Sequence, residues 1–193
     1  MFMFIDGLRF QPWIGANYFT GGRLLLIGES HYLDDEDYSE DFTTVVIRDV
    51  FLTRKEMGTL FFKNTGSLFY SDDYYKIWDE ISFANAIQIG FPDAKSQPGV
   101  QEIKTIAPAF KLLLNDLKPT KVMVLSKRMW NHWVPEDNGK FVCHISENGK
   151  KSTIWEYYYD GGKCLAMGIK HPSWMFGNSH VSWKPMVDQF LAM

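Results

Sequence analysis

The chain has 193 residues, of which 46% are hydrophobic and 22% are charged, as in an ordinary globular protein. This composition predicts one domain spanning residues 1–193 and excludes a largely disordered chain. The formal net charge of −3 argues against a broadly basic surface for nucleic acid, although a local basic rim is compatible with it.

The N-terminal residues 1–10 are apolar in places, but Asp6 and Arg9 interrupt them, so they lack the apolar core of a signal peptide. No stretch of the sequence is long and apolar enough to span a bilayer. The only cysteines are Cys143 and Cys164, which fits a reducing compartment. We therefore expect a cytoplasmic protein without a membrane partner.

The first predicted strand covers residues 23–27 (RLLLI), a short apolar run between Gly21-Gly22 and Gly28 that is typical of a strand buried on both faces. The acidic run that follows, within residues 34–41, is more typical of a solvated helix start than of a metal site. Apolar spacing then predicts helices over residues 42–52 and 54–64. Asp72 or Asp73 is expected to cap another helix that runs through Trp78.

Residues 81–90 (ISFANAIQIG) are predicted to form a second strand. Apolar residues recur at helical spacing over residues 100–117, and Lys118-Pro119 ends this helix. Residues 121–125 (KVMVL) form the next predicted strand, and Ser126 is expected to cap a helix containing Trp130 and Trp133.

Residues 141–145 and 153–159 are predicted to form a hairpin, or antiparallel excursion, around Asn148-Gly149. A last core strand over residues 164–169 leads into a closing helix over residues 181–191. The alternation of strands and helices predicts a three-layer α/β/α domain with a central, mainly parallel, four-stranded sheet plus the hairpin excursion.

Polar motifs stand where three of these strands end, which is where ligands bind in parallel α/β sheets. They are GESHY (residues 28–32), Asn85 within SFANAIQ, and HPS (residues 171–173). In this order, these motifs resemble those of the uracil-DNA glycosylase superfamily. GESHY resembles both the GQDPY and the GEAPG forms of its first motif, and KPTKVMVL is similar to the strand that follows its long helix.

The resemblance implies hydrolysis of the N-glycosidic bond of uracil or another deaminated base in DNA. Asn85 would read the flipped base, since its amide offers both a donor and an acceptor. His171 would stabilise the negative charge that develops on the departing base, and Glu29 would place the attacking water. The plainer alternatives are an amide that satisfies a strand end, a turn histidine, and a carboxylate that fixes its own loop.

Tyr32 aligns with the tyrosine that crowds the position of the thymine methyl group, and a half-buried structural tyrosine is the alternative. Phe61, Phe62, Phe69 and Tyr70 are candidates for stacking on the base, and we favour Phe69. The rest of the predicted pocket loop is Gly28, Ser30, His31, Pro172 and Ser173. Ser30 departs from the family pattern because it replaces the aspartate of GQDPY. Apolar candidates for a wedge into the DNA are Trp174, Met175 and Phe176.

No cofactor is expected, because water is the only second reactant and two cysteines cannot hold an iron–sulfur cluster. A zinc site from His31, His144, His171 and His180 is conceivable, but their spacing matches no known ligand pattern, so no metal is predicted. The expected partner is DNA or a nucleobase or nucleotide ligand. Two alternatives stay open, a protein that binds nucleotides or nucleic acid without cleaving them, and an enzyme acting on another small heterocycle or nucleoside.

Overall fold

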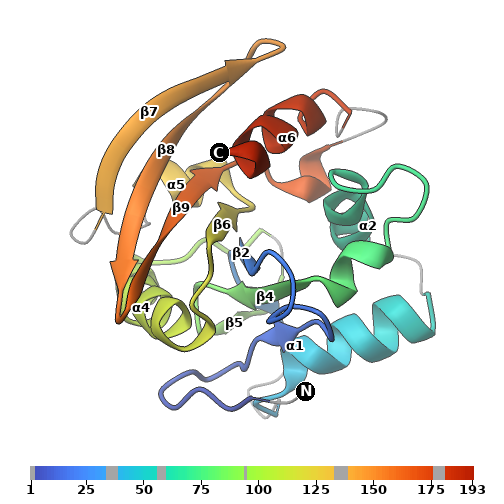
Figure 1. Ribbon diagram of the computed structural model, residues 1–193. Helices are drawn as coiled ribbons and strands as arrows, with labels where there is room; N and C mark the ends of the chain where they lie inside the picture. Colours follow the sequence, from blue (N-terminus) through green and yellow to red (C-terminus); the bar gives the residue numbers. More distant parts are fainter. Residues whose placement is uncertain (1–2, 34–38, 56–59, 94, 133–138, 176–180) are drawn as a thin grey trace.

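The structure, a computed structural model, describes residues 3–33, 39–55, 60–93, 95–132, 139–175 and 181–193. At its centre lies a seven-stranded mixed sheet with the order β1-β4-β2-β6-β9-β8-β7 (Figure 1). Its middle strands run parallel to one another; they are β4 (Ile81–Asn85), β2 (Leu24–Gly28), β6 (Lys121–Val124) and β9 (Gly162–Gly168). The short β1 (Trp13–Ile14) pairs antiparallel with β4. The predicted α/β class is confirmed, and the predicted parallel strands form the middle of a larger sheet.

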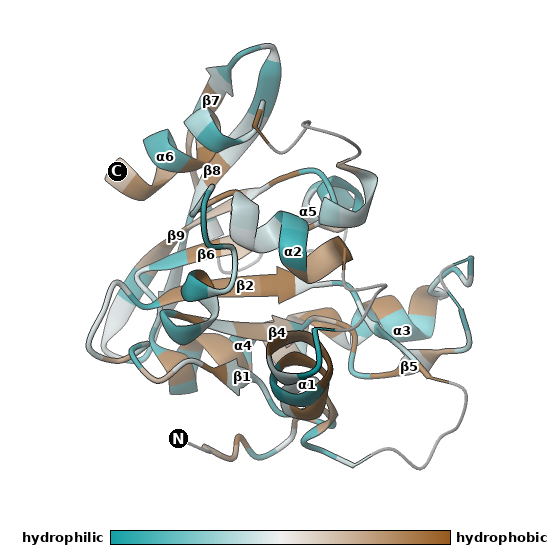
Figure 2. Cartoon of the chain, turned by 90° about the vertical axis from the view of Figure 1, so that its right-hand side faces the viewer, coloured by the Kyte–Doolittle hydropathy of each residue, from teal (hydrophilic) through white to brown (hydrophobic). Residues whose placement is uncertain are grey.

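Helices cover both faces of this sheet because β2 is apolar on both sides. Leu25 and Ile27 pack into one core cluster with α4 (Ile106–Leu117) and α5 (Lys127–His132). Leu24 and Leu26 pack into the other cluster with η1 (Val46–Thr53), α2 (Leu60–Ser67) and α6 (Lys184–Ala192). Figure 1 shows α2 and α6 on one side of the sheet and α4 on the other, and β2 is coloured as hydrophobic over most of its length in Figure 2.

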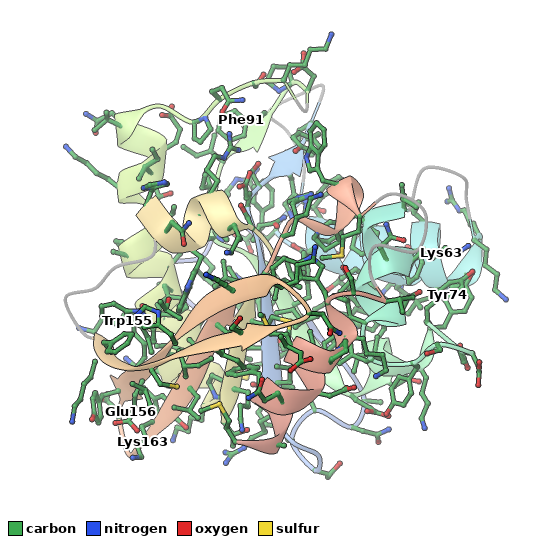
Figure 3. The ribbon with its side chains drawn as sticks, turned by 90° about the horizontal axis from the view of Figure 1, so that it is seen from above. Lys63, Tyr74, Phe91, Trp155, Glu156 and Lys163 are labelled. Atoms are coloured by element: carbon green, nitrogen blue, oxygen red, sulfur yellow. The ribbon has the colours of Figure 1, made fainter. Side chains whose placement is uncertain are left out.

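The predicted hairpin is present as β7 (Gly139–Glu147) and β8 (Lys150–Tyr159). Asn148 and Gly149 turn the chain with φ of +50° and +71°, the left-handed conformation that a tight hairpin requires. The hairpin is not an excursion, however, because β8 pairs antiparallel with β9 and extends the main sheet. Lys163 Nζ and Glu156 Oε2 form an ion pair of 2.7 Å between these two strands (Figure 3).

The predicted strand over residues 81–90 was too long, since β4 ends at Asn85. The Ala86 and Ile87 amides then donate to the carbonyls of Gly28 and Glu29, each at 2.9 Å. Further on, β5 (Gly90–Phe91) pairs with β3 (His31–Tyr32) in a separate two-stranded parallel sheet. The segment after β4 therefore lies along the GESHY segment and holds it in place.

The single helix predicted over residues 100–117 is broken at Thr105 into α3 (Val100–Lys104) and α4. Pro108 explains the break, because it has no N–H to donate to the carbonyl of residue 104 and its ring would clash with that carbonyl. The end of the helix is as predicted: α4 stops at Leu117, and Lys118 adopts a left-handed φ of +47°.

The other helices differ from the predictions mainly in their bounds. The helix predicted over residues 42–52 is α1 (Phe42–Val45) continued by the π-helical η1, and the one predicted through Trp78 is a single 3-10 turn, η2 (Lys76–Asp79). Part of the helix predicted over residues 54–64 lies outside the described residues, as does Trp133. The closing helix α6 begins at Lys184. None of the helices in the described ranges is long and apolar enough to cross a membrane.

Candidate functional site

The four parallel strands bring polar side chains to one edge of the sheet. Asn85 is the last residue of β4, Glu29 directly follows β2, Ser126 follows β6, and His171 follows β9. Glu29, Asn85 and His171 line the same cavity, of about 280 Å³, and Ser126 is hydrogen-bonded to Glu29. The structure thus brings together the three residues on which the sequence prediction depends; the roles assigned to them stay predictions.

Asn85 presents a buried and unpaired amide to this cavity. Only 5% of the residue is exposed, and its side-chain amide makes no hydrogen bond within the described part of the chain. Gly28 lies opposite in β2, where a Cβ atom would overlap Asn85 Oδ1, so only glycine leaves room for the amide. A ligand in the cavity therefore meets one free donor and one free acceptor.

His171 is held so that one ring nitrogen is left for a ligand. Its Nδ1 accepts a hydrogen bond from the Ser173 amide at 3.3 Å, which places the proton of the neutral ring on Nε2. Burial lowers the pKa of His171, and the nearby Glu29 carboxylate offsets part of this effect while Arg128 adds to it. The ring is therefore neutral at neutral pH and has an Nε2–H to donate.

The loop that carries His171 is fixed from α2. Asn64 Nδ2 donates to the carbonyls of Pro172 and Met175 at 2.9 Å and 3.1 Å, and Pro172 itself is buried. These bonds hold the short turn η3 (Pro172–Trp174) against the core. Asn64 was not predicted as a site residue, and its surroundings in the sequence offer no local signal, because it lies between Lys63 and Thr65 in α2.

Glu29 is held by two groups that the sequence analysis did not assign to the site. Its Oε2 lies 2.7 Å from Arg128 Nη2, and its Oε1 accepts hydrogen bonds from Ser126 Oγ and, at 3.4 Å, from Arg128 Nε. Ser126 caps α5 as predicted, since its Oγ accepts from the Met129 amide at 3.2 Å. The position of Ser126 in the sequence could have predicted its place in the site, because Ser126 follows a buried parallel strand just as Glu29 does.

Aromatic rings form the walls of the cavity, and they correct one prediction. The rings come from Phe42, Phe61, Phe62 and Phe83. Phe69, the favoured stacking residue, instead lines a different cavity beside Leu24, at the opposite end of β2. The reason is the direction of α2, whose first turn reaches the carboxyl ends of the strands while the residues after it lie at their amino ends. Phe61 is the better candidate, with its ring centroid 5.2 Å from that of His171.

Ser30 and Ser173, both predicted for the pocket loop, also line this cavity, and so does Tyr32, which was predicted to lie beside the base. Tyr32 is half exposed, and partial burial followed by the Glu29 charge raises the pKa of its phenol. His31 lines the cavity too, but its Nε2 is already bonded to Thr43 Oγ1 at 2.9 Å. Burial lowers the pKa of His31 to about 4, so this ring is a neutral structural group.

The structure describes two of the three residues that were predicted as a wedge into the DNA. Trp174 is 62% exposed and suits such a role, whereas Met175 is buried in the core and does not. Phe176 and His180 lie outside the described residues.

A second, larger cavity of about 550 Å³ adjoins the first and shares Glu29, Tyr32, His171 and Ser173 with it. Its further lining includes the cationic side chains of Lys127, Arg128 and Lys170. These residues form a local basic rim on a chain whose net charge is negative.

No group of three or more histidine, cysteine, aspartate or glutamate residues within the described ranges is arranged to hold a metal ion. No family model matches the chain, and no curated protein matches its sequence. A volume of about 280 Å³ lies near the lower end of ligand cavities, roughly 300–1,000 Å³, and the aromatic walls favour a small planar ring.

Proposed function

We propose that this chain hydrolyses the N-glycosidic bond of uracil or another deaminated base in DNA, as its resemblance to the uracil-DNA glycosylase superfamily implies. The observation that carries the proposal is the unpaired amide of Asn85, which faces the same aromatic cavity as the Nε2–H of His171. A flipped base is recognised by hydrogen bonds to its edge and by stacking, and this cavity supplies both.

In the proposed reaction, Asn85 pairs with a carbonyl oxygen and the adjacent N–H of the base. As the bond between the sugar C1′ and the base nitrogen breaks, its electron pair passes to the base, and His171 Nε2–H donates to the carbonyl oxygen that gains the charge. Water adds to C1′ on the other side and loses a proton through Glu29, and the departing base takes up a proton. The products are the free base and an abasic sugar.

Glu29 also supplies negative charge near the cationic sugar that forms in such reactions. Its ion pair with Arg128, however, favours a second candidate function. A carboxylate whose oxygens are both engaged by Arg128 and Ser126 is a poor acceptor for the water proton. This observation favours a protein that binds a nucleobase, nucleotide or nucleic acid without cleaving it.

Cleavage of defined oligonucleotides separates the two functions. Single- and double-stranded oligonucleotides carrying uracil, hypoxanthine or xanthine are incubated with the protein and treated with alkali, which breaks the strand at abasic sites. We expect strand cleavage by the wild type and a rate loss of about 10²–10³-fold in His171→Ala, with a comparable loss in Asn85→Ala.

The matched controls are His144→Ala on β7 and Asn115→Ala on α4, which line neither cavity. Both should cleave at the wild-type rate. If the wild type binds these oligonucleotides but cleaves none of them, hydrolysis is ruled out and the binding function is supported.

A further inference from the structure

Arg128 lies at the boundary between the two cavities and could serve either of two partners. It binds Glu29, which lines both cavities, and its Nη1 also donates to Gln97 Oε1 at the wall of the larger one. The guanidinium is therefore placed between the carboxylate beside the base cavity and any anion that enters the basic rim.

The larger cavity has the charge of an anion site. Among the residues that the structure describes, Lys127, Arg128 and Lys170 face it together with one carboxylate, that of Glu29. Lys127 Nζ is anchored, since it donates to the Lys151 carbonyl at 2.5 Å. Lys170 is exposed and has no ion pair among the residues that the structure describes. A base held in the smaller cavity would carry its sugar and phosphate toward this rim, because the two cavities share four lining residues.

The strengths of the two competing interactions permit an exchange. The Arg128 side chain is 43% exposed, so solvent screens its ion pair with Glu29, whose own side chain is 12% exposed. A phosphate, by contrast, accepts two parallel hydrogen bonds from a guanidinium and gains the attraction of the neighbouring lysines. Phosphate in the rim therefore competes well with Glu29 for Arg128.

We propose that Arg128 moves from Glu29 to a phosphate of the substrate when the base enters its cavity, and that this exchange frees the Glu29 carboxylate. The inference rests on the proposed function, because it explains how a carboxylate held by Arg128 becomes available to water. It also defines the substrate class: a base whose sugar carries a phosphate is a substrate, and a free nucleoside is not.

Binding of an oligothymidylate that carries one 2′-fluoro-deoxyuridine tests the exchange without cleavage, because its uracil can enter the cavity while the fluorine destabilises the cationic sugar that cleavage requires. Affinity is measured by fluorescence anisotropy over a series of salt concentrations for the wild type, Arg128→Gln, Glu29→Gln and the double variant. We expect Arg128→Gln to weaken binding about fivefold and to reduce the slope of log affinity against log salt by about 0.7, the loss of one phosphate contact.

Glu29→Gln should tighten binding about fivefold, because Arg128 no longer has to leave a carboxylate. In the Arg128→Gln background, the same substitution should have no effect. An equal gain in both backgrounds would overturn the exchange, because it would reflect only general repulsion between Glu29 and the strand. An unchanged salt slope in Arg128→Gln would overturn it too, even if Glu29→Gln does not fold.

Arg48→Gln is the matched control. Arg48 forms an ion pair of 2.7 Å with Asp49, is 53% exposed and lines neither cavity, so its loss should not change binding. Deoxyuridine monophosphate, taken through the same set of variants, separates a free nucleotide from a strand as the source of the phosphate. If the effect of Glu29→Gln on binding depends on Arg128 but no uracil substrate is cleaved, the exchange is supported and the proposed hydrolysis is ruled out. If uracil is cleaved but the effect of Glu29→Gln does not depend on Arg128, the hydrolysis is supported and the exchange is ruled out.

Discussion

Each end of the parallel strands holds a cavity, and the polar groups at the two ends differ in whether they are paired. At the carboxyl end, the Asn85 amide and His171 Nε2 have no hydrogen-bond partner within the described ranges. At the amino end, the cavity beside Leu24 contains Tyr70, whose hydroxyl donates to both oxygens of Glu80 at 2.9 Å and 2.8 Å.

This difference indicates which end is built for a ligand. The Asn85 amide and the His171 ring face a cavity, so without a protein partner they are left to bond water or a ligand that enters it. The paired groups at the amino end gain nothing from a ligand and contribute to the fold instead. The pairing of polar groups, more than the size of a cavity, thus separates the candidate site from a structural cavity.

The largest expected effect concerns His31, which lines the carboxyl-end cavity but is paired with Thr43. Burial lowers the pKa of His31 from 6.5 to about 4, so the unfolded chain takes up a proton at a higher pH than the folded one. Above pH 6.5 the ring is neutral in both states, and His31 does not lower the stability of the fold. As the pH falls from 6.5 to about 4, the unfolded chain binds a proton that the folded protein does not, and the free energy of unfolding decreases. The loss amounts to about 3 kcal/mol of the free energy of unfolding.

Urea unfolding across this pH range, compared between wild type and His31→Gln, measures the effect. The amide of glutamine is uncharged at every pH, so the variant should lose about 3 kcal/mol less on acidification. Carboxylates titrate in both proteins and cancel in the comparison. Equal losses in the two proteins would mean that His31 is protonated in the folded state and belongs with the ligand-binding groups.

The sequence was informative wherever a local signal decides the structure. The apolar run around Leu24–Gly28 locates its strand, and the φ of Asn148 follows from the needs of a tight turn. Glu29, Asn85 and His171 could be predicted to meet because the ends of parallel strands share one edge of a sheet. The break before Pro108 was also signalled, but the apolar spacing continued through it and favoured one helix.

What the sequence could not supply depends on contacts between distant segments. Arg128 and Glu29 are 99 residues apart, and nothing local to either indicates their ion pair. The choice of Phe69 over Phe61 failed because the direction of α2 relative to the sheet is set by packing. Likewise, the pairing of β8 with β9 is not encoded in the hairpin turn.

A medium effect on the free energy of unfolding is expected for Asn64, whose side chain is hydrogen-bonded, and Asn85, whose side chain is not bonded to any described residue, serves as the comparison. Asn64→Ala deletes two hydrogen bonds to the loop of His171 and should lower the free energy of unfolding by about 2 kcal/mol. Asn85→Ala deletes none and should change it by less than about 0.5 kcal/mol. Denaturant unfolding of both variants measures this, and equal losses would break the comparison between paired and unpaired groups.

The smallest expected effect compares one tyrosine from each end. Tyr70→Phe removes the hydroxyl that bonds to Glu80, and because both groups are partly exposed, the loss should be about 1 kcal/mol in the free energy of unfolding. Tyr32→Phe removes a hydroxyl with no hydrogen bond to any described residue, so the free energy of unfolding should stay within about 0.5 kcal/mol of the wild type.

The same pair of variants also separates stability from binding. Tyr70→Phe should bind and cleave uracil oligonucleotides as the wild type does, because it lies at the amino end of the strands. Tyr32→Phe keeps the ring that faces both carboxyl-end cavities and should therefore keep its discrimination against thymine. Cleavage of thymine by Tyr32→Phe would assign that discrimination to the hydroxyl group, and a loss of cleavage in Tyr70→Phe would extend the functional site to both ends of the sheet.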